Sequence, residues 1–288
     1  MRDKGLARVI DIHSRSAIEA GSLGFLPRCL VLTSLPHSRP LDNRFVRTNG
    51  NVTVSLATTS SLGLPYGVYP RKLLISISTE AVRTQSPSVS LGSSLRGYLR
   101  SLGLGTSGGK HGPWQPFQDQ ARRLFGTVIS IEHTGNRCSS QHNILPVEDA
   151  DIWWSPQDLQ EDVIWESRIT LSEKFFRQII ESPIPLDWRV VQGLSRSPLA
   201  IDIYTWGSYR RAKARGMSRI PWDELQAQFG VGYSIDSKGR NNFKRKFEAV
   251  INAVAVFDPE MLRCLVPQKE GLLVKPGRPH VPRLPAWG

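Results

Sequence analysis

The side chains best suited to bind another molecule lie close together near the C-terminal end of the sequence. Between Ser237 and Phe257, ammonium, guanidinium and carboxamide groups recur every few residues. Such groups pair with phosphate oxygens, and Asn can form two hydrogen bonds with the edge of an adenine. The chemistry that they indicate is recognition of nucleic acid. The candidate contacts are Lys238, Arg240, Asn241, Asn242, Lys244 and Arg245.

A helix over this stretch would place these groups on one side. The apolar residues recur at alternating spacings of four and three, which puts them on a helix face that packs against a core. They are Phe243, Phe247, Val250, Val254 and Phe257. Asp236 or Ser237 can cap the first turn. The helix dipole opposes cations in the first two turns, and a bound phosphate would relieve that conflict. The alternative is an ordinary core helix with a solvated basic face.

The excess positive charge is concentrated in the same part of the chain. The formal net charge is +12. From Tyr204 onward, fifteen Lys or Arg stand against seven Asp or Glu, so this stretch alone contributes +8. Such a surface attracts nucleic acid or an anionic membrane. The uneven distribution favours a localised binding surface.

Composition also bears on where the protein works. The sequence has no run of eighteen apolar residues, so we expect no membrane span and no membrane partner. The first thirty residues lack the continuous apolar stretch of a secretory signal. Three widely spaced cysteines, Cys29, Cys138 and Cys264, do not form a disulfide framework. These features favour a reducing, cytoplasmic location.

The pattern of elements predicts an α+β fold made of tandem winged-helix domains. Helices, strands and turns follow one another in two similar passes of three helices and a hairpin. The first pass has helices at Arg71–Arg83, Ser93–Leu102 and Trp114–Phe125, with strands at Val52–Thr58 and Thr127–His133. The second has helices at Ser197–Arg215, Trp222–Phe229 and Ser237–Phe257, and a hairpin formed by Met261–Val266 and Gly271–Val274.

Four segments are predicted on this basis. Residues 1–40 should form a partly disordered arm or an extended cover segment, broken by Pro36 and Pro40. Residues 41–150 should form the first winged-helix domain, for dimerisation and a secondary DNA contact, and residues 167–288 the second, which carries the main DNA recognition. The acidic residues 151–166 should connect the two.

Further contacts are expected on the hairpin and in the first domain. The wing would contribute Arg263, Lys269 and Lys275, which would hold the DNA backbone. The counterpart of the cationic helix is Trp114–Phe125, which carries less charge and should bind DNA more weakly. Its contacts would be Gln115, Gln118, Arg122 and Arg123.

No enzymatic motif is complete. The loop Gly103–Lys110 resembles a P-loop, but Leu104 stands where the first Gly is needed and His111 where Ser or Thr should bind magnesium. His133, Cys138 and His142 lie close in sequence, yet zinc would need a further ligand or an open position. We therefore expect no enzyme activity, no cofactor and no metal.

Seven stretches of the sequence also resemble one protein family. They are L-P-R-C-L-V-L-T-S-L-P-H-S at 26–38, L-P-Y-G-V-Y-P-R at 64–71, I-S-T-E-A-V-R-T at 77–84, L-G-S-S-L at 91–95, L-S-E-K-F-F at 171–176, R-S-P-L-A-I-D-I-Y at 196–204 and I-P-W-D-E-L at 220–225. In this order they resemble the RepA-type plasmid replication initiators, from about residue 26 to Val281.

The resemblance implies a function. It implies a bacterial cytoplasmic protein that binds repeated sites (iterons) in a plasmid origin, helps to open the adjacent duplex, and brings in the host's replication initiator and helicase. It also implies tandem winged helices and a possible change between homodimer and DNA-binding monomer. One alternative is a winged-helix transcriptional repressor that regulates its own promoter with the same helix. An enzyme acting on DNA is the other.

Overall fold

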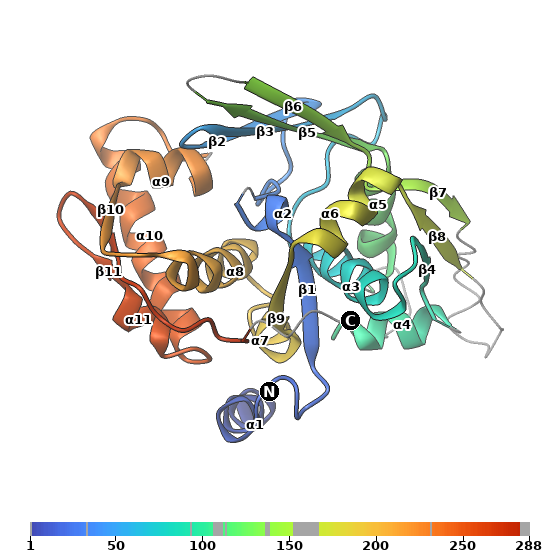
Figure 1. Cartoon of the computed structure of the whole chain (residues 1–288), viewed down its shortest axis with the longest axis horizontal. Coiled ribbons are helices and arrows are strands. Elements are labelled where there is room, and N and C mark those ends of the chain that lie inside the picture. The colour runs from blue at the N-terminus through green and yellow to red at the C-terminus, as the bar shows by residue number, and fades with distance from the viewer. Residues whose placement is uncertain are drawn as a thin grey trace.

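The computed structural model describes residues 2–32, 34–92, 94–105, 112, 114–135, 139–151, 167–230 and 232–282, without the side chains of residues 2–4, 49 and 95. Within this part, helices combine with four antiparallel sheets (Figure 1). The predicted α+β class is therefore confirmed. One continuous apolar core extends from Ile12 to Val274.

The N-terminal unit consists of helices and a three-stranded sheet within residues 68–171. In chain order it contains α3 (Val68–Thr84), β4 (Ser88–Ser90), α4 (Leu95–Ser101), α5 (Trp114–Phe125), β7 (Val147–Asp151) and β8 (Arg168–Leu171). The strand order in its sheet is β4-β8-β7, so the third strand lies between the other two. Ser94 caps α4 by accepting a hydrogen bond from the Gly97 N–H.

The C-terminal unit, within residues 198–274, repeats this order. It contains α8 (Pro198–Lys213), β10 (Ser218–Pro221), α9 (Trp222–Phe229), α10 (Ser237–Ala255), the short α11 (Glu260–Cys264), β11 (Leu265–Pro267) and β12 (Gly271–Val274). Its strand order, β10-β12-β11, again places the third strand in the middle. The unit lies at one end of the molecule, at the left of Figure 1.

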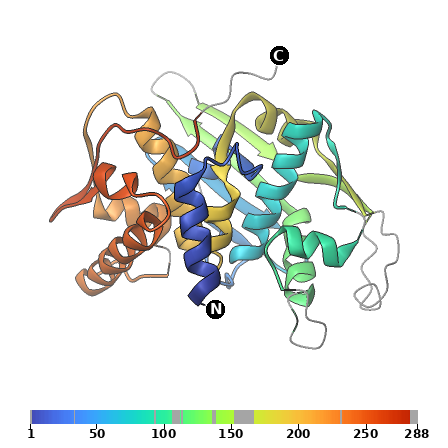
Figure 2. The same cartoon turned by 90° about the horizontal axis from the view of Figure 1, so that it is seen from below.

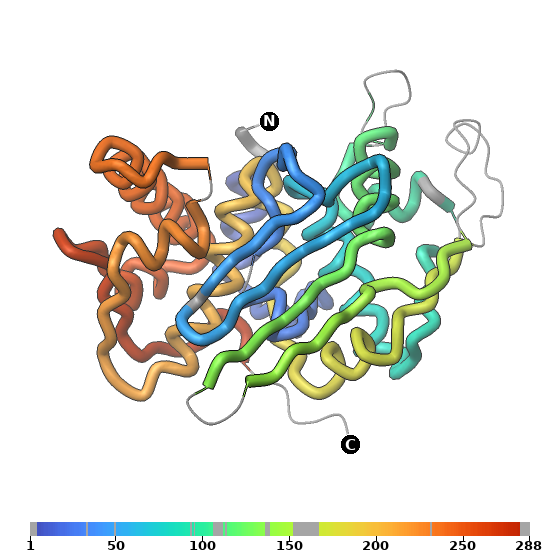
Figure 3. Tube along the Cα trace, turned by 90° about the horizontal axis from the view of Figure 1, so that it is seen from above, coloured from blue at the N-terminus to red at the C-terminus, as the bar shows by residue number. Residues whose placement is uncertain are grey.

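A four-stranded sheet distinguishes the N-terminal unit. The strands β2 (Arg44–Asn49), β3 (Val52–Thr58), β5 (Thr127–Thr134) and β6 (Ser139–Ile144) pair in the order β2-β3-β5-β6 and extend across the top of the molecule (Figure 3). Phe45, Leu56, Ile129 and Ile144 are in register and buried on its inner face. Arg47 follows on that face and donates a hydrogen bond to the Ala227 carbonyl at 3.3 Å, so the sheet also contacts α9.

The predicted disordered arm is wrong, because the first forty residues are largely built into the fold. They form α1 (Arg2–Ser14), β1 (Leu23–Pro27) and α2 (Arg28–Leu32), and β1 pairs with β9 (Pro183–Asp187). Phe25 and Leu26 of β1 are buried. The burial of this apolar segment outweighs the prolines, which a two-stranded ribbon tolerates because each strand has an open edge.

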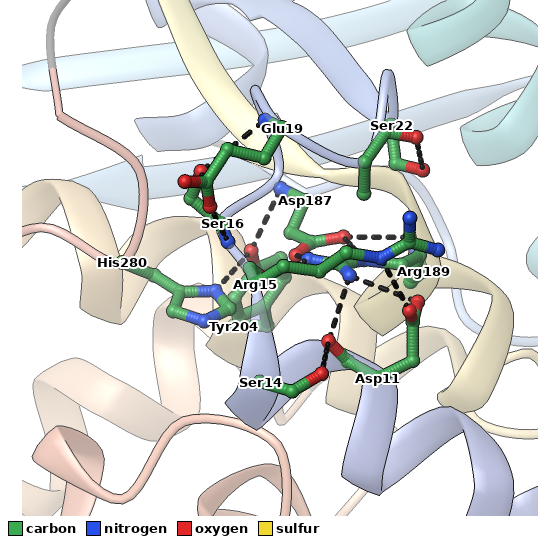
Figure 4. Close-up of polar contacts among 11 residues, drawn as sticks. Asp11, Ser14, Arg15, Ser16, Glu19, Ser22, Asp187, Arg189, Tyr204 and His280 are labelled. Atoms are coloured by element: carbon green, nitrogen blue, oxygen red, sulfur yellow. Dashed lines mark hydrogen bonds and ion pairs between the residues drawn. The ribbon is translucent and has the colours of Figure 1, made fainter.

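A polar cluster fastens α1 to the body of the protein. Arg189, at the start of α7 (Trp188–Gly193), forms ion pairs with Asp11 and Asp187 at 2.9 and 2.7 Å (Figure 4). Beside it, the Tyr204 hydroxyl accepts a hydrogen bond from the Asp187 N–H and contacts His280. As a result, α1 lies across the underside of the molecule (Figure 2).

The acidic residues 151–166, predicted to connect the two domains, lie at a different place in the fold. Residues 152–166 lie outside the described residues, but the strands on either side of them, β7 and β8, pair with each other. The segment therefore joins two strands of one sheet. The chain passes to the C-terminal unit later, through α6 (Glu173–Glu181), β9 and α7.

A buried ion pair joins the first helices of the two units. Asp202 of α8 accepts hydrogen bonds from the Arg71 guanidinium of α3, from Nε to Oδ1 and from Nη2 to Oδ2, both at 2.7 Å. His37 Nε2 lies 2.8 Å from the same carboxylate. Burial lowers the pKa of His37 below its ordinary value, although Asp202 opposes that effect. This cluster fixes how the two units lie against each other.

Candidate nucleic-acid interface

The helix predicted from the apolar spacing is confirmed as α10. Its Asp236 cap accepts a hydrogen bond from the Gly239 N–H at 2.6 Å. Phe243, Phe247 and Val254 are fully buried, and Phe247 packs edge-on against the Trp222 ring of α9 at 5.9 Å between centroids. The apolar face of α10 thus locks the helix onto its unit, and the opposite face remains available.

The cationic groups of α10 lie mainly on that opposite face. Side chains at four of the six predicted positions are exposed and the other two are half-buried. The exposed ones are Lys238, Arg240, Asn241 and Arg245, and the half-buried ones are Asn242 and Lys244. Arg245 donates a hydrogen bond to Asn242 Oδ1 at 2.6 Å.

One cation was missed by the sequence analysis. Lys246 is exposed on α10, and its position off the apolar stripe could have revealed it. It adds positive charge to the third turn of α10 and therefore belongs with the candidate contacts.

Lys244 has a structural contact of its own. Its ammonium group lies 5.3 Å from the centroid of the Trp222 ring and donates a hydrogen bond to the Gln268 carbonyl at 3.1 Å. Trp222 Nε1 donates to the same carbonyl at 3.0 Å. Gln268 is in the turn between β11 and β12, so Lys244 ties α10 to the hairpin. The ammonium group also lies 3.9 Å from the Glu248 carboxylate, so its partners all belong to the C-terminal unit.

The hairpin carries fewer of the predicted contacts than expected. Lys269 is exposed in its turn, and Lys275 is half-buried just after β12. Arg263 is exposed, but it lies on α11 and is 3.5 Å from Glu260. The prediction of a strand at this position was wrong because α11 begins after Pro259, which starts a helix without needing its missing N–H.

The corresponding helix α5 presents a smaller polar surface. Gln115 and Arg122 are exposed, and Gln118 is half-buried. Arg123 is buried: its Nε donates to Asp119 at 2.8 Å, and its guanidinium lies 5.5 Å from the centroid of the Tyr66 ring. The prediction that Arg123 contacts DNA is therefore wrong, because this side chain stabilises the inside of the N-terminal unit.

The remaining chemical candidates receive no support from the geometry. Among the described residues, no three His, Cys, Asp or Glu side chains lie together as a metal site would require. His133 and His142 lie opposite Ser140 and Ile131 in the β5–β6 pair, whereas Cys138 and most of the Gly103–Lys110 loop lie outside the described residues. No helix in the described part is long and apolar enough to cross a membrane.

Comparison with known families identifies the chain. A family described as plasmid-encoded RepA protein matches residues 64–224, which is more than half of the sequence and extends from the start of α3 into α9. The chain belongs to this RepA family. The resemblance found in the sequence motifs is thus confirmed, and the family supports a role as a replication initiator.

One solved structure supports a shared fold. The crystal structure of domains 2 and 3 of RctB, as the selenomethionine derivative, has a TM-score of 0.50 and 10% sequence identity, and the match covers 78% of this chain and 81% of that one. A second crystal structure, of RctB residues 155–483, has a TM-score of 0.48 and 11% identity over 77% and 82% of the two chains. No curated protein sequence matches the chain.

Proposed function

We propose that this protein initiates plasmid replication by binding repeated duplex sites in the plasmid origin. The observation that carries the proposal is α10, a helix with a buried apolar face and an exposed cationic first half. Such a helix can enter a major groove, where Arg pairs with guanine and Asn with adenine. The bound sites would be the repeats that recur in the origin.

We interpret each unit as a winged helix. In both, a helix, a strand, two further helices and a hairpin follow in order, and the third strand lies between the first two. In the C-terminal unit, α10 would be the recognition helix and the turn between β11 and β12 the wing. Lys244 holds these two elements together through Gln268, so they would meet the DNA as one surface.

Later steps follow from this binding mode. A protein bound along adjacent repeats would help to open the neighbouring duplex and would bring in the host's replication initiator and helicase. The activity is binding rather than catalysis, takes place in the bacterial cytoplasm, and needs no cofactor. We also propose that the protein forms a homodimer, which dissociates into monomers before they bind the repeats.

The first test measures sequence discrimination. Fluorescence anisotropy would compare the affinity for a duplex carrying one repeat of the protein's own replicon with that for a scrambled duplex, at low and near-physiological salt. Specific recognition predicts a gap of about a thousandfold or more. Equal and steeply salt-dependent affinities for both duplexes would contradict the proposal, because phosphate contacts alone produce that result.

A repressor that uses the same helix is the second candidate. Repressor and initiator would both pass the binding test, so a second measurement separates them. Supplied in trans, an initiator maintains a plasmid that carries only the origin repeats, and permanganate reactivity reveals unpaired thymines beside them. A repressor lowers expression from its promoter and leaves both of these readouts unchanged.

A further inference from the structure

An apolar side chain stands at the tip of the cationic helix. Ile235, in the turn between α9 and α10, directly precedes the Asp236 cap and is 88% exposed. Isolated exposed apolar side chains are common on proteins and need no explanation by themselves. The position of Ile235 is what matters, because the first residues of a recognition helix are those that reach base edges.

The turn that carries Ile235 is tightly held on both sides. Before it, the Tyr233 ring packs edge-on against Phe243 at 5.7 Å between centroids, and the Ser234 carbonyl accepts a hydrogen bond from Gln226 at 2.9 Å. After it, Asp236 Oδ1 accepts hydrogen bonds from Ser234 Oγ and the Gly239 N–H. The exposure of Ile235 is therefore imposed by an ordered backbone.

Gly239 gives independent evidence that this turn has a fixed shape. A Cβ atom on Gly239 would lie 2.0 Å from the Ser234 carbonyl oxygen, which is far inside contact distance. The turn thus folds directly onto the first turn of α10, where only glycine fits. Ile235 is held at a fixed place relative to the exposed Lys238 and Arg240.

Ile235 also lacks the partner that usually covers such a residue. An apolar residue just before a helix cap commonly packs against one four positions into the helix. That position is Arg240, which is exposed. The carboxylate of Asp236 is engaged by the cap, and its hydrogen bonds to Gly239 and Ser234 hold its pKa below the ordinary value. The apolar surface at this end of the helix is therefore free for an outside partner.

Base edges in the major groove offer one apolar group, the 5-methyl of thymine. We propose that Ile235 contacts the methyl group of a thymine in the recognised site and so selects thymine over cytosine at one position of each repeat. The inference rests on the proposed DNA-binding function. It assigns base selectivity to an uncharged residue, whereas the neighbouring cations contribute affinity for phosphates.

Deoxyuridine substitution tests the contact, because it removes the methyl group and leaves base pairing unchanged. Full-length protein would be titrated with duplexes of one origin repeat in which each thymine in turn is replaced by deoxyuridine. We expect the affinity of the unaltered protein to fall by about fourfold at one position, the value for losing one buried methyl. Ile235→Ala should bind the thymine and uracil duplexes equally at that position and should behave like the unaltered protein at every other position.

Two variants serve as controls. Ile235→Val keeps an apolar contact and should retain most of the methyl dependence. Met217→Ala removes another exposed apolar side chain, which precedes β10, and should change nothing. Circular dichroism and thermal unfolding would show that each variant folds.

The outcomes separate the two proposals. If Ile235→Ala keeps the same dependence on the methyl group, or if the unaltered protein prefers the repeat but ignores every thymine methyl, the role of Ile235 is refuted and specific DNA binding stands. If the unaltered protein does not distinguish the repeat from a scrambled duplex, the DNA-recognition function itself fails.

Discussion

The two units share one order of elements but use their third helix differently. In the C-terminal unit, α10 has 19 residues and turns a cationic face outward. In the N-terminal unit, α5 has 12 residues and contributes one exposed arginine, Arg122, while Arg123 is buried. The comparison teaches that the same framework can turn a cationic helix face outward in one unit and pack the corresponding helix inward in the other.

The four-stranded sheet, whose strands β5 and β6 are inserted between α5 and β7, accounts for much of this difference. The chain leaves α5 directly into β5, and the Thr127 hydroxyl donates a hydrogen bond back to the Arg123 carbonyl at 2.7 Å. Trp114, Phe117 and Leu124 of α5 are buried. With so much of its surface packed, α5 retains only a narrow polar strip. In contrast, α10 is followed by a short helix and a small hairpin.

The largest effect is expected where the two units meet. Asp202→Ala should lower the free energy of unfolding by about 3–5 kcal/mol, because it leaves the buried Arg71 guanidinium without its counter-charge. Urea unfolding would measure the change. Glu80→Ala, which breaks a more exposed pair with Arg83, is the control and should cost less than about 1 kcal/mol. A similar loss in both variants would show that the Asp202 pair does not hold the units together.

A smaller loss of stability is expected within the N-terminal unit. Arg123→Ala removes a partly buried hydrogen bond to the charged Asp119 and should cost about 1.5–3 kcal/mol. The folded variant should bind origin DNA with unchanged affinity and salt dependence. The matched control is Arg122→Ala, the exposed neighbour, which should leave stability unchanged. If the Arg123→Ala variant were fully folded but bound DNA more weakly, Arg123 would be a DNA contact after all.

The comparison of the third helices is tested by DNA affinity. Arg240→Ala in α10 should reduce discrimination between repeat and scrambled duplex by about 1–3 kcal/mol if Arg240 pairs with a base. Arg122→Ala in α5 should have a clearly smaller effect, because α5 presents less charge. Anisotropy titrations with both duplexes would measure this. Equal effects of the two changes would mean that both units read the DNA with similar strength.

A contact to phosphate has a different signature. Arg245→Ala should weaken binding to all sequences alike and lower the slope of log affinity against log salt by about one unit, provided that Arg245 meets a phosphate. Titrations over a range of salt concentrations would measure the slope. A loss confined to the repeat would instead assign Arg245 to a base.

The smallest expected effect concerns pH. Burial lowers the pKa of His37, which lies in the cluster that joins the units, and of His280, which contacts Tyr204. Both are protonated more readily in the unfolded chain, so their contribution is complete above pH about 6.5 and declines as the pH falls. His37→Asn should flatten this decline in unfolding measurements, whereas the exposed His142→Asn should not. An unchanged pH profile in His37→Asn would exclude His37 as a source.

Local patterns predicted much of the fold. The bounds predicted for α5, α9 and β3 match the structure, as do the α10 stripe and the Asp236 cap. These elements follow from apolar spacing and capping, which operate over a few residues. The binding candidates on α10 were predictable for the same reason, since its apolar face determines which side chains face outward.

The features that were not predicted depend on packing between residues that are distant in the sequence. Arg122 and Arg123 are adjacent and chemically identical, and only the position of Tyr66 and Asp119 determines which of them is buried. The pairing of β1 with β9 joins segments that prolines mark locally as breaks. The exposure of Ile235 depends on how the turn closes on Gly239, which no local pattern shows.

The pairing of β1 with β9 also determines how late during synthesis the N-terminal segment can fold. Arg189, which follows β9, bonds to Asp11, 178 residues earlier in the chain. At about 5–20 residues per second, the ribosome needs roughly ten to thirty-five seconds to add that much chain. For most of this interval the apolar strand β1 has been made but its partner has not. The nascent protein therefore has to keep its N-terminal segment from aggregating until the second half of the chain emerges.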